Sequence, residues 1–182
     1  MALHQPVHAK CNPQYRAYHD SGKRDIGVIK LIVLHDTEGG SAASIAHYFA
    51  EASSGGSAHL VVDDAGCYRC LPDDMIPWGA PGANVDGFHI EQCAYARWTR
   101  DEWLRHDAML HRVAYKVAAA GKRFEIPMKF VDHYGILAGH KGITTHAEVT
   151  KAYPKLGTHT DPGSGYPIHH VIDLAHNYRA GL

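Results

Sequence analysis

Two segments that lie far apart in the chain contain the side chains best suited to chemistry. The first, residues 32–37, is a hydrophobic run that ends in His-Asp-Thr and includes His35. The second contains His146 and, further along, Asp161 within His-Thr-Asp-Pro-Gly. These three residues offer two imidazoles and a carboxylate. Three such ligands, with a fourth position left to water, are typical of a catalytic zinc site, whereas a structural site uses four protein ligands.

Each of these residues also has an ordinary structural interpretation. A histidine at the end of a strand more often packs than binds a metal, and an aspartate before Pro-Gly is a good turn residue. The chain has 16 histidines, so their number alone does not select the ligands. Four further histidines remain open as alternative ligands: His133, His140, His169 and His170.

The first half of the chain predicts strands separated by one helix. Residues 26–34 are nearly continuous in apolar side chains towards their end, which favours a strand buried on both faces. Ser41 is placed to cap a following helix. Residues 59–71 predict a hairpin around an Asp-Asp-Ala-Gly turn, and residues 88–91 predict a third strand.

The second half predicts two main helices. Thr99 begins a capping-box pattern, and we expect its helix to continue to Gly121. Residues 124–141 predict a short strand and loops. Pro167 suits the first turn of a last helix. The order of elements predicts an α+β fold, layered α/β/α, with a mixed central β-sheet flanked by helices.

Composition limits the class of protein. A chain of 182 residues with 45% hydrophobic and 20% charged residues fits a single globular domain, 1–182, whose residues 1–25 we expect to wrap the surface. A net charge of −1 gives no footprint for nucleic acid or an anionic membrane. No apolar run reaches the length of a membrane span, and the first residues lack the pattern of a signal peptide.

The four cysteines predict no metal or redox site. Cys67 and Cys70 form a lone CxxC within the hairpin, without the second CxxC that a four-cysteine zinc site needs. We therefore interpret them as ordinary strand residues. Because no export signal is evident, we expect free thiols at these positions and at Cys11 and Cys93.

Five stretches, taken in order, resemble one family. The chain is similar to the zinc-dependent N-acetylmuramoyl-L-alanine amidases shared by bacteriophage endolysins, bacterial cell-wall amidases and animal peptidoglycan recognition proteins. The last stretch looks particularly like endolysins of phages that infect mycobacteria and their relatives. The stretches are residues 32–37, 57–63, 88–91, 145–148 and 159–163.

The resemblance implies roles for the site residues. It implies that His35, His146 and Asp161 hold one Zn²⁺ ion and that Glu91 is the catalytic glutamate. His159 falls where many relatives carry a lysine that assists catalysis, and a histidine can also donate a hydrogen bond to an oxyanion, although its charge depends on pH.

Substrate contacts are implied less directly. By the resemblance, Trp78 and Thr160 line the cleft, and His59 occupies a position that either lines the cleft or packs within the sheet. Relatives often read Trp-His where this chain reads Trp78-Gly79, so one substrate-contacting histidine is missing here.

The implied reaction is hydrolysis of the amide between N-acetylmuramic acid and the L-alanine of the stem peptide, for phage-induced host lysis. We expect a monomer without a nucleic-acid partner that accumulates in the host cytoplasm, and that can be one module of a larger endolysin. Three alternatives remain: a non-catalytic peptidoglycan-binding module of the same fold, a recycling amidase acting on anhydro-muropeptides, and a metal-binding protein without enzymatic activity.

Overall fold

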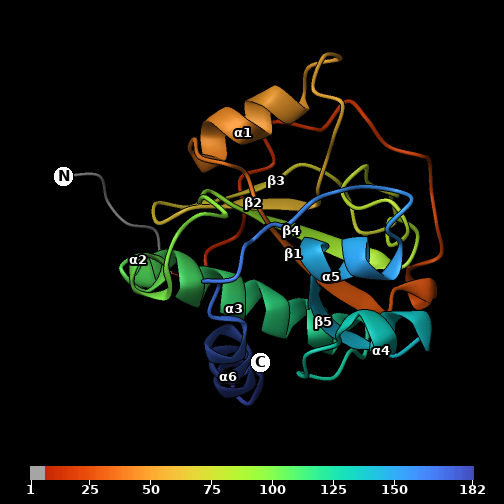
Figure 1. Cartoon of the computed structure of the whole chain (residues 1–182). Helices are drawn as coiled ribbons and strands as arrows, with labels where there is room; N and C mark the ends of the chain where they lie inside the picture. The colour runs from red at the N-terminus through yellow and green to blue at the C-terminus, as the bar shows by residue number, and fades with distance from the viewer. Residues whose placement is uncertain (1–6) are drawn as a thin grey trace.

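The computed structural model describes residues 7–182 and contains one five-stranded sheet in the order β3-β2-β4-β1-β5 (Figure 1). Neighbouring strands run parallel except β2 and β3, which form the antiparallel hairpin. The mixed central sheet is confirmed. The strands are β1 (Leu31–Asp36), β2 (Leu60–Val62), β3 (Cys67–Arg69), β4 (Gly87–Gln92) and β5 (Gly142–Thr145).

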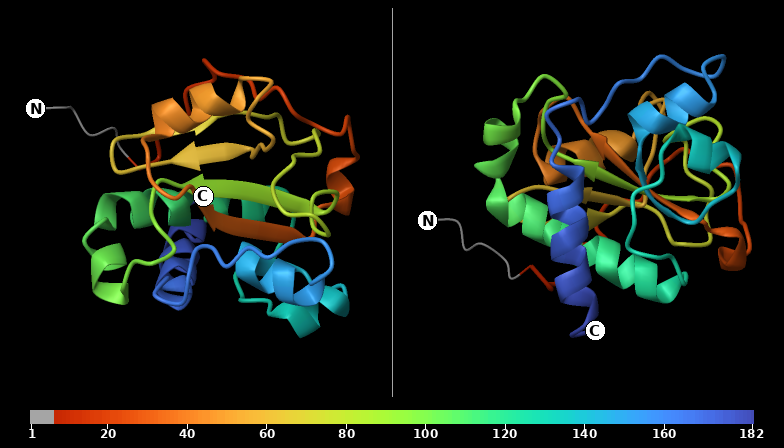
Figure 2. Two further views of the ribbon diagram at one scale, coloured as in Figure 1. Left: turned by 45° about the horizontal axis from the view of Figure 1, so that its top comes forward. Right: turned by 60° about the horizontal axis from the view of Figure 1, so that its bottom comes forward.

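Helices cover both faces of the sheet, as the α/β/α prediction requires. The two longest helices, α3 and α6, pack together on one face, and α1, α4 and α5 lie on the other (Figures 1 and 2). A 3₁₀ turn, η1 (Ile26–Val28), precedes β1. The helices are α1 (Ala42–Phe49), α2 (Arg100–Leu104), α3 (Asp107–Arg123), α4 (His133–Leu137), α5 (His146–Ala152) and α6 (Ile168–Arg179).

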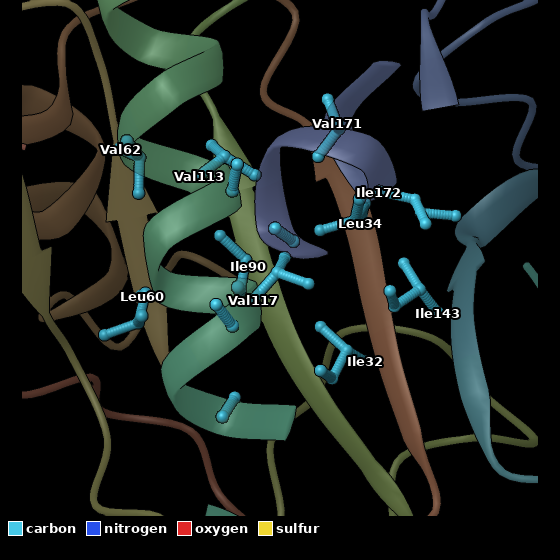
Figure 3. Close-up of a cluster of buried hydrophobic side chains, with 14 of the residues drawn as sticks. Ile32, Leu34, Leu60, Val62, Ile90, Val113, Val117, Ile143, Val171 and Ile172 are labelled. Atoms are coloured by element: carbon cyan, nitrogen blue, oxygen red, sulfur yellow. The ribbon is translucent and has the colours of Figure 1, made fainter. Parts of the chain in front are cut away.

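Side chains alternate between the two faces along each central strand. In β1, Ile32 and Leu34 point into the apolar cluster beneath α3 and α6, where side chains such as Val117 of α3 meet them (Figure 3). The intervening residues, Val33 and His35, belong to the opposite face. The same alternation in the neighbouring strands gives the sheet one face within the largest apolar cluster and an opposite face that carries polar side chains beside two smaller apolar clusters.

The predicted helix starts are confirmed. The Ser41 side chain accepts a hydrogen bond from Ser44 N and caps α1. Thr99 and Glu102 form the reciprocal capping box at the start of α2. Pro167 stands immediately before α6, where its missing N–H costs nothing.

The prediction of one strand over residues 26–34 was wrong. Asp25 accepts a hydrogen bond from Gly27 N at 2.8 Å, and this local cap turns residues 26–28 into η1. The strand therefore begins only at Leu31 and continues to Asp36.

Two helical predictions also need correction. The helix expected from Thr99 to Gly121 is divided into α2 and α3, because His106 leaves the helical conformation (φ −95°, ψ 45°). Its ring lies 2.5 Å from an Asp64 oxygen and stacks on Trp98. Residues 124–141, expected to contain only a strand and loops, include α4, which begins where Asp132 accepts a hydrogen bond from the N–H of the helix's third residue.

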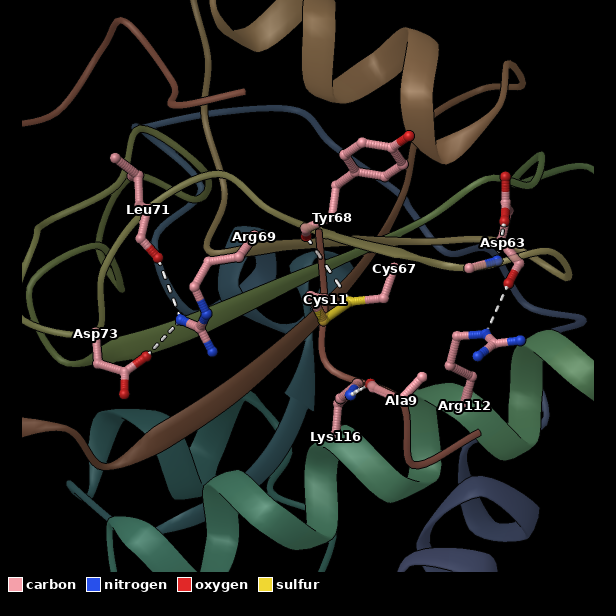
Figure 4. Close-up of a disulfide and its surroundings, with 11 residues drawn as sticks. Ala9, Cys11, Asp63, Cys67, Tyr68, Arg69, Leu71, Asp73, Arg112 and Lys116 are labelled. Atoms are coloured by element: carbon pink, nitrogen blue, oxygen red, sulfur yellow. Dashed lines mark hydrogen bonds and ion pairs between the residues drawn. A yellow bond between two sulfur atoms is a disulfide. The ribbon is translucent and has the colours of Figure 1, made fainter. Parts of the chain in front are cut away.

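The expectation of free thiols was wrong for two cysteines. Cys11 and Cys67 form a disulfide, whereas Cys70 and Cys93 are free (Figure 4). The N-terminal segment runs beside β3, where Asn12 bridges Tyr68, and this pairing brings the two cysteine Cα atoms within 4.5 Å. Of the segment 1–25 that was expected to wrap the surface, residues 1–6 lie outside the described part.

No helix within residues 7–182 is both long enough and apolar enough to span a bilayer.

Candidate metal centre and active site

The candidate site lies at the carboxyl ends of three parallel strands. In the β1–β4 pairing His35 is opposite Glu91, and in the β1–β5 pairing Leu34 is opposite Thr145. His146 follows as the first residue of α5. Because parallel strands end at the same edge of a sheet, these side chains from distant parts of the chain meet there.

A loop after α5 supplies the third ligand. The backbone N–H of Ala147 donates to the carbonyl oxygen of Asp161 at 2.9 Å, which attaches this loop to the start of α5. His35 Nδ1 lies 3.1 Å from His146 Nδ1 and 3.3 Å from Asp161 Oδ2, and His146 Nδ1 lies 3.1 Å from Asp161 Oδ1. All three residues are buried. Two imidazole nitrogens and one carboxylate oxygen so arranged fit a zinc ion with an open position.

Within the part of the chain that the structure describes, these residues form the one group of three or more side chains able to hold a metal ion. The alternative ligands lie elsewhere: His133 pairs with Glu148 at 2.9 Å, and His169 packs against Phe130. Neither His140 nor His170 joins the group.

Electrostatics at the triad favour a cation. Burial alone would raise the pKa of Asp161, but its close contacts with the His146 and His35 rings outweigh it and hold the pKa well below its usual range. Burial lowers the pKa of His35, so its ring is neutral near pH 7. A carboxylate and neutral imidazoles are the protonation states that bind a metal.

Glu91 stands beside the triad on the same face of the sheet. Its Oε1 lies 4.0 Å from His35 Nδ1, and its side chain is 12% exposed. Burial, followed by the charges of Asp161 and Asp36, raises the pKa of Glu91 well above its usual value. Among residues 7–182, Glu91 Oε2 is one of four buried side-chain atoms without a hydrogen-bond partner. This oxygen is closed off from solvent, whereas Oε1 is the oxygen that lies towards the triad.

His159 lies over the triad on its solvent side. Its ring stacks on His146, with centroids 4.2 Å apart and planes 16° apart. Its Nδ1 lies 3.7 Å from Asp161 Oδ1, and 59% of its side chain is exposed. Thr160 is also exposed, at the rim of the cleft. The structure thus brings both residues to the place where a substrate would meet the triad.

Two hollows meet at the triad. One, of about 490 Å³, extends towards Trp78, and the other, of about 440 Å³, extends along α1 past Tyr48. Both are lined by Glu91, His159 and Asp161. A chain-like substrate can therefore pass across the triad with one part in each hollow.

Trp78 forms part of the wall of the first hollow and is 43% exposed. Its indole N–H donates to Ser21 Oγ at 2.8 Å, and His19 stacks on its ring with centroids 4.5 Å apart. These contacts hold the indole as a flat apolar surface, which suits a sugar ring or a peptide side chain.

His59 does not contact the cleft, so its expected role in substrate binding needs correction. Its side chain is completely buried and lines neither hollow. His59 Nδ1 accepts a hydrogen bond from His89 N at 3.0 Å, and the guanidinium of Arg24 lies 2.8 Å from Nε2. The residue packs beneath the loop that carries Trp78, which was the alternative interpretation of its position.

Two buried residues at the site were not identified from the sequence. His89 lies two residues before Glu91 on β4, and its ring is 3.0 Å from His35. Asp36 lines both hollows, its Oδ2 has no partner among residues 7–182, and burial raises its pKa to about 7. The period of two along β4 placed His89 on the face of Glu91, and Asp36 follows His35 directly; both signals were present in the sequence.

Comparisons with known proteins agree with this geometry. The family model described as N-acetylmuramoyl-L-alanine amidase matches residues 24–164. No curated protein matches the chain.

Solved structures share the fold at low sequence identity. The hydrolase AmiA of Staphylococcus aureus, solved with its ligand, has a TM-score of 0.74 at 18% identity, with 94% of this chain and 83% of that chain covered. A mutant endolysin from Bacillus subtilis has a TM-score of 0.56 at 17% identity, covering 94% and 97%. The N-acetylmuramoyl-L-alanine amidase LysC from Clostridium intestinale has a TM-score of 0.53 at 13% identity, covering 88% and 95%.

The match of the family model extends over most of the chain and includes every residue of the candidate site, from His35 to Asp161. The chain therefore belongs to the N-acetylmuramoyl-L-alanine amidase family and is a peptidoglycan amidase.

Proposed function

We propose that this amidase is zinc-dependent and hydrolyses the amide bond between N-acetylmuramic acid and the L-alanine of the stem peptide. The observation that carries the proposal is the convergence of three donor atoms, from His35, His146 and Asp161, within 4.8 Å of one another beside Glu91. A zinc ion held by these side chains would supply a Lewis acid that polarises the amide carbonyl and lowers the pKa of water to about 7.

Glu91 is proposed as the general base and then the general acid. An amide resists hydrolysis because its carbonyl is a poor electrophile and its amine a poor leaving group. Glu91 Oε1, the oxygen that faces His35, can accept the proton of the attacking water, and the carboxyl group can then deliver it to the departing L-alanine nitrogen, so that no charged amide anion has to leave. Its burial beside the ligands supports this role because it raises the pKa of the carboxyl group, which makes the carboxylate a stronger proton acceptor.

His159 is proposed to stabilise the tetrahedral oxyanion, with Thr160 as a second donor. Its ring is held by stacking on His146 and remains exposed to the cleft, so that an N–H can point at the substrate carbonyl. Preorganised donors of this kind act where negative charge develops in the transition state. In this arrangement His159 supplies hydrogen bonding, while the triad holds the metal.

Trp78 is proposed to bind one side of the substrate. The indole forms part of the wall of one hollow, and its support by Ser21 and His19 fixes the ring before binding. A preformed aromatic surface costs little entropy when substrate binds.

The proposed biological role is lysis of a phage-infected bacterium, with the enzyme acting as a monomer on the wall after release from the host cytoplasm. The likeness to an endolysin fold supports this role. Size-exclusion chromatography tests the oligomeric state. Expression inside a host with and without a membrane-permeabilising partner tests the route to the wall, because lysis without that partner would contradict it.

The decisive experiment measures new L-alanine amino termini released from purified peptidoglycan. We expect release that EDTA abolishes and added zinc restores. Tight wall binding without release would indicate a non-catalytic module, and release only from soluble anhydro-muropeptides would indicate a recycling amidase. New reducing sugar ends would contradict the proposed bond.

A further inference from the structure

His89 is a completely buried histidine that the proposed mechanism does not use. It lies on β4, on the same face of the sheet as Glu91, and its ring contacts the His35 ring end to end, with centroids 5.1 Å apart. Both ring nitrogens have a partner: Nδ1 lies 3.0 Å from His35 Nε2, and Nε2 lies 3.2 Å from the carbonyl oxygen of Ala83. The ring thus connects a backbone carbonyl to a candidate metal ligand.

The chemistry of the two contacts fixes the direction of the hydrogen bonds. A carbonyl oxygen can only accept, so His89 Nε2 carries the proton of the neutral ring and donates it to Ala83. His89 Nδ1 then has a lone pair and accepts from His35 Nε2–H. His35 Nδ1 is consequently without a proton, and this is the nitrogen that faces His146 and Asp161.

The backbone around His89 leaves room for this ring and little else. A Cβ atom added at Gly79 would lie 2.5 Å from His89 Nδ1, and one added at Gly87 would lie 2.4 Å from the Ala83 carbonyl oxygen and 2.5 Å from His89 Nε2. The N–H of His89 donates to His59 Nδ1 at 3.0 Å, which fixes the strand at this point. Glycine at 79 therefore accommodates the imidazole, which occupies the space that a side chain after Trp78 would need, and glycine at 87 accommodates both the ring and the Ala83 carbonyl group that it contacts.

We propose that His89 is a positioning residue for the metal centre, which holds His35 in the tautomer and orientation that leave Nδ1 free to bind the ion. The proposal rests on the zinc site proposed above. The ring N–H of a metal-bound histidine that does not face the metal usually donates to a carboxylate, a backbone carbonyl or water. Here an imidazole extends the reach of the Ala83 carbonyl to His35, and it links the loop that carries Trp78 to the ligand.

The test compares two variants of His89. If His89 acts by accepting the hydrogen bond from His35, the order of their zinc affinities is the reverse of the order expected if His89 only fills space. His89→Phe keeps a flat ring of similar size but loses both nitrogens. His89→Asn is smaller, yet its amide oxygen falls near the position of Nδ1 and can still accept from His35 Nε2–H. If the hydrogen bond to His35 matters, His89→Asn should retain zinc binding better than His89→Phe. If only packing matters, His89→Phe should retain it better.

Zinc affinity is measured by competition with a chromophoric chelator, with thermal unfolding of the metal-free proteins as a control for folding. We expect His89→Phe to bind zinc about 10–100-fold more weakly than the wild type, and His89→Asn to recover most of the loss. Ile90→Val, a buried change on the opposite face of the same strand, should leave zinc affinity unchanged. Equal affinity in wild type and His89→Phe would overturn the proposal.

A second measurement does not depend on any variant folding. Nitrogen-15 NMR of the histidines in the metal-free wild type should show His35 protonated at Nε2 and His89 also protonated at Nε2. Protonation of His35 at Nδ1 would contradict the proposed role of His89. Failure of the wild type to bind zinc would instead contradict the proposed function, and the tautomers would still decide the role of His89.

Discussion

The face of the sheet covered by α3 and α6 differs from the opposite face in what the same strands place on it. On the first face β4 contributes Phe88 and Ile90, both within the largest apolar cluster. Ile90 is labelled in Figure 3. On the second face the same strand contributes His89 and Glu91, both at the candidate site. Residues adjacent in sequence therefore belong to different parts of the protein.

Stability and chemistry are therefore divided between the two faces. Apolar burial contributes roughly 25 cal/mol per Å² removed from water, so the face under α3 and α6, which has the largest apolar cluster, is where most of that stabilisation arises. The opposite face holds buried ionisable groups, whose desolvation opposes folding unless hydrogen bonds or a metal compensate it. A substitution on the face under α3 and α6 should therefore change stability more than metal binding or turnover, and a substitution on the opposite face should do the reverse.

The largest expected effect is that of Glu91→Gln. The amide keeps the shape of the side chain but cannot take a proton from water, and general acid–base catalysis typically contributes roughly 10²–10⁴-fold in rate. We expect a loss of L-alanine release within that range, with zinc content and melting temperature close to those of the wild type. A variant that lost its zinc would indicate that Glu91 acts on the metal site instead.

The next prediction separates two residues of the same loop. His159→Ala should lower turnover by roughly 10²–10³-fold, because it removes one oxyanion donor, and should retain zinc. Asp161→Ala should lower zinc affinity itself, because it removes one of the three donors within the triad. Zinc content by atomic absorption, together with turnover, checks both. Equal metal loss in the two variants would contradict the assignment of roles.

Ile90→Ala tests the face under α3 and α6. The side chain is completely buried, and deleting such a side chain costs roughly 2–5 kcal/mol because apolar burial is lost and a cavity remains. We expect a lower free energy of unfolding in urea. At a temperature where the variant is folded, zinc affinity should match that of the wild type. A loss of zinc affinity in folded protein would mean that the two faces are coupled.

The sequence was sufficient for the main features that depend on local patterns. Alternation, caps and turns are set by neighbouring residues, so the strands around His35 and Glu91, the cap at Ser41 and the box at Thr99 were predictable. The layered fold followed from the order of these elements. The grouping of His35, His146 and Asp161 was expected from the family resemblance, and the structure brings their donor atoms together.

What the sequence did not reveal depends on contacts between distant segments. The disulfide was missed because only the pairing of Asn12 beside Tyr68 brings the two cysteines together. The break at His106 depends on Asp64, which lies 42 positions earlier in the chain. The burial of His59 depends on Arg24 and on the loop above it. Such partners are chosen by tertiary packing, which a local pattern does not specify.

The smallest expected effect comes from the disulfide, which joins the N-terminal segment to the edge strand β3 (Figure 4). It lies beside the face under α3 and α6. Replacing Cys11 and Cys67 together with serine should lower the free energy of unfolding by about 2–4 kcal/mol, since an open segment gains freedom mainly in the unfolded state. Wild type in a reducing agent should unfold like the variant, which provides an internal control.

The same variant also tests whether the disulfide affects Trp78 in the cleft. Beyond Cys11 the segment continues to His19 and Ser21, which support Trp78 at the cleft. Backbone bonds such as Ser21 N to the Ile76 carbonyl hold that part of the segment independently of the disulfide. We therefore expect turnover to be unchanged at temperatures where the variant is folded. A raised KM at unchanged kcat would show instead that the disulfide also positions Trp78. A bond beside the face under α3 and α6 would then act on the cleft at the opposite face.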